Sequence, residues 1–111
     1  MFEYKAELLN VIDGDTVKLQ IDLGFSVHVK QSCRLVRINA PEMSTMNGFT
    51  SRQFIVDTLT PATAIKVSTS KPDKYGRWLV DLFFQTIPTG ETWTSLSDLL
   101  LSTQHAVPYP S

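Results

Sequence analysis

Alternation of apolar and polar positions dominates the first third of the chain. Residues 4–12 alternate loosely and residues 16–21 alternate with a period of two, which predicts two half-buried strands. Asp13-Gly14 lies between these runs, and this dipeptide in such a place is a strong hairpin signal. A third run, residues 25–38, predicts a longer strand with a bend at residues 31–32.

The rest of the chain switches between helical and strand patterns. Thr50-x-x-Gln53 has the form of a capping box and predicts a helix that ends near Leu59, before Pro61. Three further elements are predicted, namely strands over residues 64–68 and 78–84 and a second helix over residues 96–104. The order of three strands, helix, two strands and helix is that of a five-stranded OB barrel, so we expect one mainly β (α+β) domain over residues 1–111.

Composition narrows the class of protein. Hydrophobic residues make up 42% of the 111 positions and charged residues 19%, which excludes wholesale disorder. Cys33 is the single cysteine, so neither an internal disulfide nor a cysteine-built metal site is expected. No apolar run has the length of a membrane span, so we expect no membrane partner. No signal peptide is visible at Met1, so we expect a cytoplasmic protein, for which a phage is one source.

The net charge of −1 conceals an uneven distribution. Residues 1–77 contain ten Lys or Arg and eight Asp or Glu, whereas residues 78–111 contain three Asp or Glu and no Lys or Arg. All basic residues therefore lie in the predicted barrel portion. A near-neutral total does not argue against a nucleic-acid partner, but it predicts weak, salt-sensitive capture of phosphates.

Single polar residues along the predicted strands have more than one interpretation. Turn chemistry alone explains Asp13. Asp15 begins a strand, where a carboxylate is poor strand material, and a hard-cation ligand is the competing interpretation. Arg34 and Arg37 lie among apolar neighbours, and their odd spacing places them on opposite faces of the strand.

Taken together, three segments resemble the signature segments of the staphylococcal nuclease (thermonuclease) family. They are VIDGDTV over residues 11–17, RLVRINAPE over residues 34–42 and DKYGR over residues 73–77, in the same order and at similar intervals. The likeness extends roughly over residues 7–109. It implies an OB barrel that hydrolyses DNA and RNA phosphodiesters with calcium, and we expect the family's third helix to be missing here.

The resemblance implies a catalytic role for three residues. Arg34 and Arg77 match the two arginines that bind the phosphate and stabilise its transition state. Glu42 matches the glutamate proposed as the general base. This set suits phosphodiester hydrolysis, since guanidinium groups offset the charge that develops on phosphate oxygens.

The resemblance also implies a metal site and nucleotide contacts. Asp15 matches a metal-ligand aspartate, Asn39 stands where the family has a second one, and the main-chain carbonyl of Ala40 would reach the metal, with Asp13 close by. Because Asn39 is neutral, divalent-metal affinity should fall and a cation other than calcium is an alternative. The expected nucleotide contacts are Lys74, Tyr75 and, from a looser alignment, Tyr109.

Two functions remain open from the sequence. The first is a monomeric, metal-dependent endonuclease acting on DNA or RNA, preferably single-stranded. The second is a catalytically inactive module that binds nucleic acid or protein, which the neutral Asn39 and the missing third helix favour. Retention of Arg34, Glu42 and Arg77 together favours the enzyme.

Overall fold

The computed structural model of the protein describes residues 2–72, 76–86 and 92–109. Within these ranges the chain forms two helices, α1 (Met46–Leu59) and α2 (Leu96–Ser102). The strands are β1 (Phe2–Asp13), β2 (Thr16–Gly24), β3 (Val27–Leu35), β4 (Ile38–Asn39), β5 (Ala64–Pro72), β6 (Trp78–Gln85), β7 (Thr94–Ser95) and β8 (Val107–Pro108). The fold is mainly β with helices, as predicted, and the two-residue strands β4, β7 and β8 add to the predicted order.

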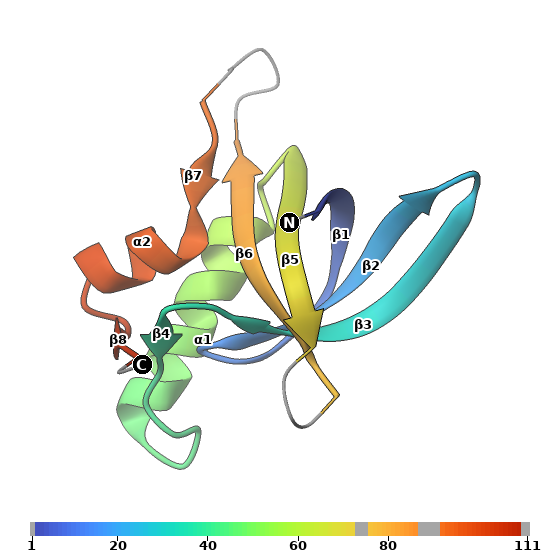
Figure 1. Cartoon of the computed structure of the whole chain (residues 1–111). Helices are drawn as coiled ribbons and strands as arrows, with labels where there is room; N and C mark the ends of the chain where they lie inside the picture. Colours follow the sequence, from blue (N-terminus) through green and yellow to red (C-terminus); the bar gives the residue numbers. More distant parts are fainter. Residues whose placement is uncertain (1, 73–75, 87–91, 110–111) are drawn as a thin grey trace.

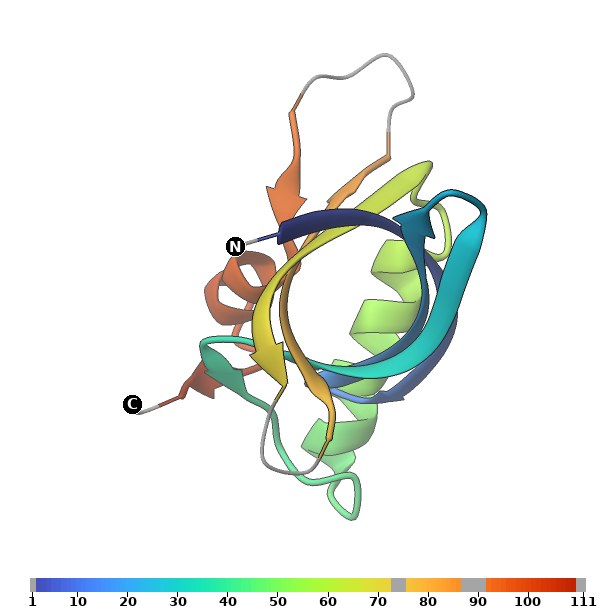
Figure 2. The ribbon, with the colours of Figure 1, turned by 45° about the vertical axis from the view of Figure 1, so that its right-hand side comes forward.

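Five strands close into a barrel (Figures 1 and 2). Strands β3, β2, β1, β5 and β6 are neighbours in that order, and each adjacent pair is antiparallel. The barrel closes where β3 pairs with β6 in parallel, with Arg34 opposite Leu79. This is an OB-like architecture, in which closure leaves few strand edges open to other chains.

The core fills the barrel and extends beneath both helices. Side chains on alternate positions of β2 point inward, and Val17, Leu19 and Ile21 are fully buried. Ile55 of α1 and Leu100 of α2 are also fully buried. Each such aliphatic side chain contributes about 1.5–3 kcal/mol on burial, so the helices are held mainly by packing. No helix within the described ranges is long and apolar enough to cross a membrane.

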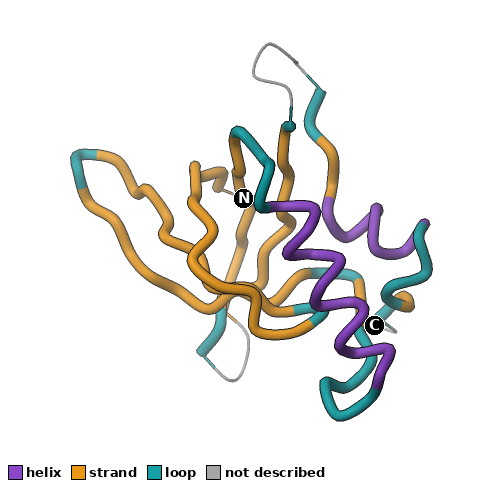
Figure 3. Tube along the Cα trace, turned by 180° about the vertical axis from the view of Figure 1, so that it is seen from behind, coloured by secondary structure: helices purple, strands orange, loops and turns teal. Residues whose placement is uncertain are grey.

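The third strand is shorter than predicted and breaks at a different residue. β3 runs without interruption through residues 31–32 and ends at Leu35, so the predicted bend is wrong. The chain instead turns at Arg37, whose φ is 69°. Phe25 and Ser26, predicted as strand, have φ of 53° and 64° and form the turn of the β2–β3 hairpin. This hairpin projects away from both helices (Figures 1 and 3).

Helix α1 begins four residues before the predicted start. Thr45 is its N-cap and its hydroxyl accepts a hydrogen bond from the Gly48 N–H at 3.0 Å. The predicted capping box at Thr50 is therefore wrong, and the Thr50 hydroxyl donates to the Met46 carbonyl instead. Gly48 is buried in the first turn of this helix, where a Cβ would clash with the Glu42 carbonyl oxygen, so only glycine fits at this position.

Helix α2 begins where the sequence predicts. The Ser95 hydroxyl accepts a hydrogen bond from the Asp98 N–H at 3.3 Å, which satisfies one free amide of the first turn. The helix ends at Ser102, two residues earlier than predicted. Its first turn lies beside the chain that leaves β3, because the Ser97 hydroxyl donates to the Val36 carbonyl at 2.9 Å.

Candidate active site

The β1–β2 turn, the residue after β4 and helix α1 meet at Gly14. A Cβ at this position would lie 2.7 Å from the Cβ of Ala40 and 2.9 Å from the Cβ of Ser51. Both distances are well below ordinary carbon contacts of about 3.5–4.0 Å. Gly14 therefore permits a close approach of three segments, and Asp15 follows it directly.

Asp15 is the centre of a hydrogen-bond cluster. Its Oδ2 accepts from the Ala40 N–H at 3.0 Å, and its Oδ1 accepts from the Thr16 hydroxyl at 3.1 Å. The Arg34 Nη2 lies 3.5 Å from Oδ2, and the two side chains are only 14% and 13% exposed. The carboxylate thus ties the segment after β4 to the β1–β2 turn, and it places a negative charge beside Arg34.

Arg34 is held by its own turn as well as by Asp15. Its Nη1 donates to the Leu35 carbonyl at 2.7 Å, and its Nη2 donates to the Ile38 carbonyl at 2.9 Å. The guanidinium carbon lies 5.7 Å from the centre of the Tyr109 ring, within the range of a cation–π contact. A guanidinium has five N–H donors. Within the described residues, Nε–H and one Nη1–H remain available to an anion.

The Asp13 and Asp15 carboxyl groups influence each other. The Asp13 Oδ1 accepts from the Asp15 N–H at 3.0 Å. Burial, together with the neighbouring Asp15, raises the pKa of Asp13. Burial alone would raise the pKa of Asp15 too, but hydrogen bonds from Asp13 and Ala40 and the charge of Arg34 bring it below its usual value. Asp15 is therefore the carboxylate that stays charged.

These oxygen atoms are the type of donor that a hard cation takes. Two adjacent carboxyl groups, Asp13 and Asp15, lie near the exposed Asn39 and the main chain of Ala40. A cation would also offset the burial, and the weaker repulsion by Asp15, that raise the pKa of Asp13. In the part of the chain that is described, no group of three or more His, Cys, Asp or Glu side chains converges. Neutral and main-chain oxygens would have to complete the coordination.

The other predicted residues are placed with less detail. Glu42 is exposed, and its carbonyl accepts from the Thr45 N–H at 3.0 Å and from the Thr45 hydroxyl at 2.6 Å. Arg77 directly precedes β6, two residues before Leu79, the partner of Arg34. Because Arg77 precedes the strand, the β3–β6 register does not assign its side chain to a face of the sheet. Lys74 and Tyr75 lie outside the described residues.

Two contributors to the cluster, Thr16 and Ser51, were not predicted from the sequence. Thr16 had been taken as an ordinary strand residue, and Ser51 carried no signal that it would pack on Gly14. Ala40 was predicted to reach a metal through its main-chain carbonyl, and in the structure its N–H donates to Asp15. Arg34 contacts Asp15, whereas Arg37 pairs with Asp81 and Asp98. Strand alternation does not explain this difference, because β3 ends at Leu35 and Arg37 lies in the turn that follows. Cys33 is fully buried in the core, and burial raises the pKa of its thiol to about 12.

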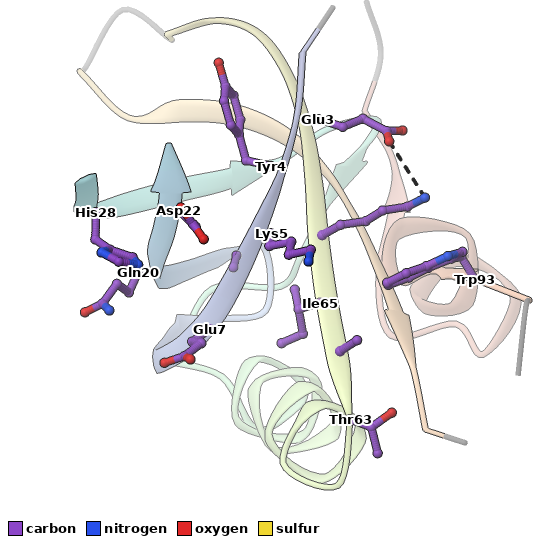
Figure 4. Close-up of a pocket in the computed structure, with 13 residues that line it drawn as sticks. Glu3, Tyr4, Lys5, Glu7, Gln20, Asp22, His28, Thr63, Ile65 and Trp93 are labelled. Atoms are coloured by element: carbon purple, nitrogen blue, oxygen red, sulfur yellow. Dashed lines mark ion pairs between the residues drawn. The ribbon is translucent and has the colours of Figure 1, made fainter. Parts of the chain in front are cut away.

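A groove of about 630 Å³ lies elsewhere, between the first halves of β1 and β5, and none of the predicted site residues lines it (Figure 4). Lys66 is one of its lining residues, 3.8 Å from the Glu3 carboxylate and 4.4 Å from the centre of the Trp93 ring. A smaller pocket of about 230 Å³ borders Asn39 and Ala40, so the predicted metal segment has a hollow beside it.

Neither a scan against protein-family models nor a search of curated proteins found a match to this chain. The function must therefore be inferred from the site itself.

Proposed function

We propose that the protein is a metal-dependent phosphodiester hydrolase that cleaves nucleic acid at the cluster of Asp15 and Arg34. The observation that carries this proposal is the Asp15 carboxylate, which lies 3.5 Å from Arg34 and accepts a hydrogen bond from Ala40. One charged acceptor and one charged donor are thereby held together beside the segment that leads to Glu42. A cation and a phosphate need such neighbouring, oppositely charged groups.

The phosphate would be bound by arginines. Arg34 has two N–H groups available within the described residues, and either can donate a charge-assisted hydrogen bond to a phosphate oxygen. Arg77 directly precedes β6, the strand that pairs with β3 beside Arg34, and would be the second phosphate-binding arginine. A divalent cation held by Asp15, with Asn39, Ala40 and Asp13 as further oxygen donors, would supply additional positive charge to the phosphate.

Glu42 would act as the general base. Its side chain is exposed, whereas its main chain is anchored by Thr45 at the start of α1. An exposed carboxylate on an anchored backbone can accept a proton from an attacking water. Pro41 separates Glu42 from Ala40, so the base would lie two residues from the segment that Asp15 holds.

A single-stranded nucleic acid is the proposed substrate. Tyr109, 56% exposed beside Arg34, offers a ring on which an unpaired base can stack. The chain carries a net charge of only −1 and no excess of basic residues, so substrate capture should be weak and should fall as salt rises. A monomer is sufficient for all these roles.

The direct test is hydrolysis of a labelled single-stranded DNA and RNA by the purified protein with millimolar calcium. Glu42→Gln should lower the rate about 100-fold or more, because general base catalysis typically contributes this much. Glu7→Gln removes an equally exposed carboxylate on β1 and is the matched control, for which no change is expected. A wild-type protein that is inactive with calcium, magnesium and manganese would refute the proposal.

One observation favours a second function, a binding module without catalysis. Both terminal nitrogens of Arg34 already donate to main-chain carbonyls of its own turn. A structural role therefore also accounts for this arginine. Binding of an oligonucleotide without cleavage, with the same affinity in Glu42→Gln, would support the module, whereas metal-dependent turnover would exclude it.

A further inference from the structure

Arg37 adopts a backbone conformation that is unfavourable for its residue type. Its φ of 69° lies in the left-handed region, where a Cβ crowds the following carbonyl. Residues with long side chains remain there only when surrounding contacts determine the conformation. Arg37 lies in the turn between Arg34 and Asn39, so the strained residue belongs to the segment that carries the proposed site.

Contacts of the Arg37 side chain connect this turn to two other elements. Its Nη1 donates to the Asp98 Oδ1 of α2 at 2.7 Å, and its Nη2 lies 3.3 Å from both carboxylate oxygens of Asp81 on β6. The same Nη2 lies 3.3 Å from the Ser95 hydroxyl. Attraction to these carboxylates raises the pKa of Arg37, chiefly through the hydrogen bond to Asp98.

The main chain of the turn is anchored on the same side. The Arg37 carbonyl accepts from the Tyr109 N–H at 3.0 Å, and the Val36 N–H donates to the Val80 carbonyl at 3.0 Å. These bonds join the turn to the end of the chain and to β6. Tyr109 is also the residue whose ring faces Arg34, so one contact of Arg37 bears directly on the surroundings of the proposed phosphate-binding arginine.

We propose that Arg37 is a positioning residue, which bridges Asp81 and Asp98 and so holds the turn that keeps Arg34 and Ala40 at Asp15. The inference deepens the proposed function, on which its catalytic consequence rests. Arg37 itself points away from Asp15 and touches no reacting group. Because its side chain is 47% exposed, each ion pair alone is worth little. The bridge acts by fixing one backbone geometry.

The test that does not depend on activity is amide hydrogen exchange followed by NMR. In Arg37→Ala, the Ala40 amide, which donates to Asp15, and the Tyr109 amide should exchange about tenfold faster or more, whereas core amides of β2 should keep the wild-type rate. Lys66→Ala is the matched control, since it removes another ion-paired cation far from Asp15. Because 1 M NaCl screens exposed charges, it should speed the exchange of the Ala40 and Tyr109 amides in the wild type, as Arg37→Ala does.

The catalytic readout separates positioning from folding stability. Arg37→Ala should lower kcat about tenfold or more at a temperature where it is fully folded, because small displacements of reacting groups are costly. Arg37→Lys should recover only part of the rate, since an ammonium cannot bridge two carboxylates as a planar guanidinium does. An inactive wild type would remove the proposed function but leave the exchange test standing. Unchanged Ala40 and Tyr109 exchange in Arg37→Ala would overturn the positioning role.

Discussion

Replacing Gly14 with alanine would push the β1–β2 turn away from the segment that carries Ala40. The new Cβ would lie 2.7 Å from the Ala40 Cβ and 2.9 Å from the Ser51 Cβ. Ordinary carbon contacts are about 3.5–4.0 Å, so the turn must move by about 1 Å. Ser51 cannot easily yield, because it is buried and its hydroxyl donates to the His105 carbonyl.

Gly14→Ala should lower the free energy of unfolding, because the added methyl group overpacks a buried position. Forcing one extra carbon into such a site costs about 1–3 kcal/mol of unfolding free energy. In a domain of this size, each kcal/mol corresponds to a fall of about 4 °C in Tm. The displaced turn also moves Asp15 relative to Ala40, so the hydrogen bond between them at 3.0 Å should lengthen.

Urea unfolding of a double-mutant cycle measures the effect. Ala40→Gly removes the closer of the two clashing groups, so the double variant should be more stable than the sum of the single effects by about 1 kcal/mol. Gly24→Ala is the control, because nothing lies within 4 Å of its added Cβ and its φ of 87° alone makes it costly. The changes in unfolding free energy caused by Gly24→Ala and Ala40→Gly should therefore be additive.

The proposed close approach at Gly14 would be refuted by either of two results. One is a Gly14→Ala variant within about 0.5 kcal/mol of the wild type, the range of ordinary surface substitutions. The other is strict additivity of Gly14→Ala and Ala40→Gly, which would show that the two side chains do not compete for space.

Three further predictions concern single groups. Because the folded pKa of Asp13 is raised, its charge costs stability above the unfolded value of 3.8, so Asp13→Asn should stabilise at pH 7 and gain nothing at pH 3. Equal gains in urea at both pH values would contradict this. Thr45→Ala removes the N-cap of α1 and should cost about 1 kcal/mol in the same assay, and no loss would argue against the cap. The thiol of Cys33, with a pKa of about 12, should react with a disulfide reagent only on unfolding, and rapid labelling of the native protein would show that it is accessible.

The strands could be predicted because neighbouring residues alone carry the pattern that specifies them. A period of two sets the inward face of residues 16–21, and the hairpin at Asp13-Gly14 follows from turn chemistry. The break after β3 was not predictable in this way. Arginine is not a typical turn residue, and the side-chain partners of Arg37 in this turn, Asp81 and Asp98, lie 44 and 61 residues further along the chain.

The start of helix α1 and the contacts of the site are likewise not predicted by local patterns of the sequence. Glycine is typical of loops, yet Gly48 lies inside α1. Only a residue without a Cβ fits there, because a Cβ would clash with the Glu42 carbonyl. The neighbourhood of Asp15 and Arg34 could be expected from the resemblance of their segments. The hydrogen bond from the Ala40 N–H and the packing of Gly14 depend on tertiary contacts, which no short motif specifies.

A crystal structure of the protein with calcium and a nucleoside diphosphate would test the central claim most directly. The account predicts one cation with Asp15 among its ligands, one phosphate in contact with the free N–H groups of Arg34 and with Arg77, and the Glu42 carboxylate within reach of a water beside that phosphate. A phosphate bound elsewhere, or an Asp15 that keeps only its contacts with Arg34 and Ala40 at saturating calcium, would contradict it.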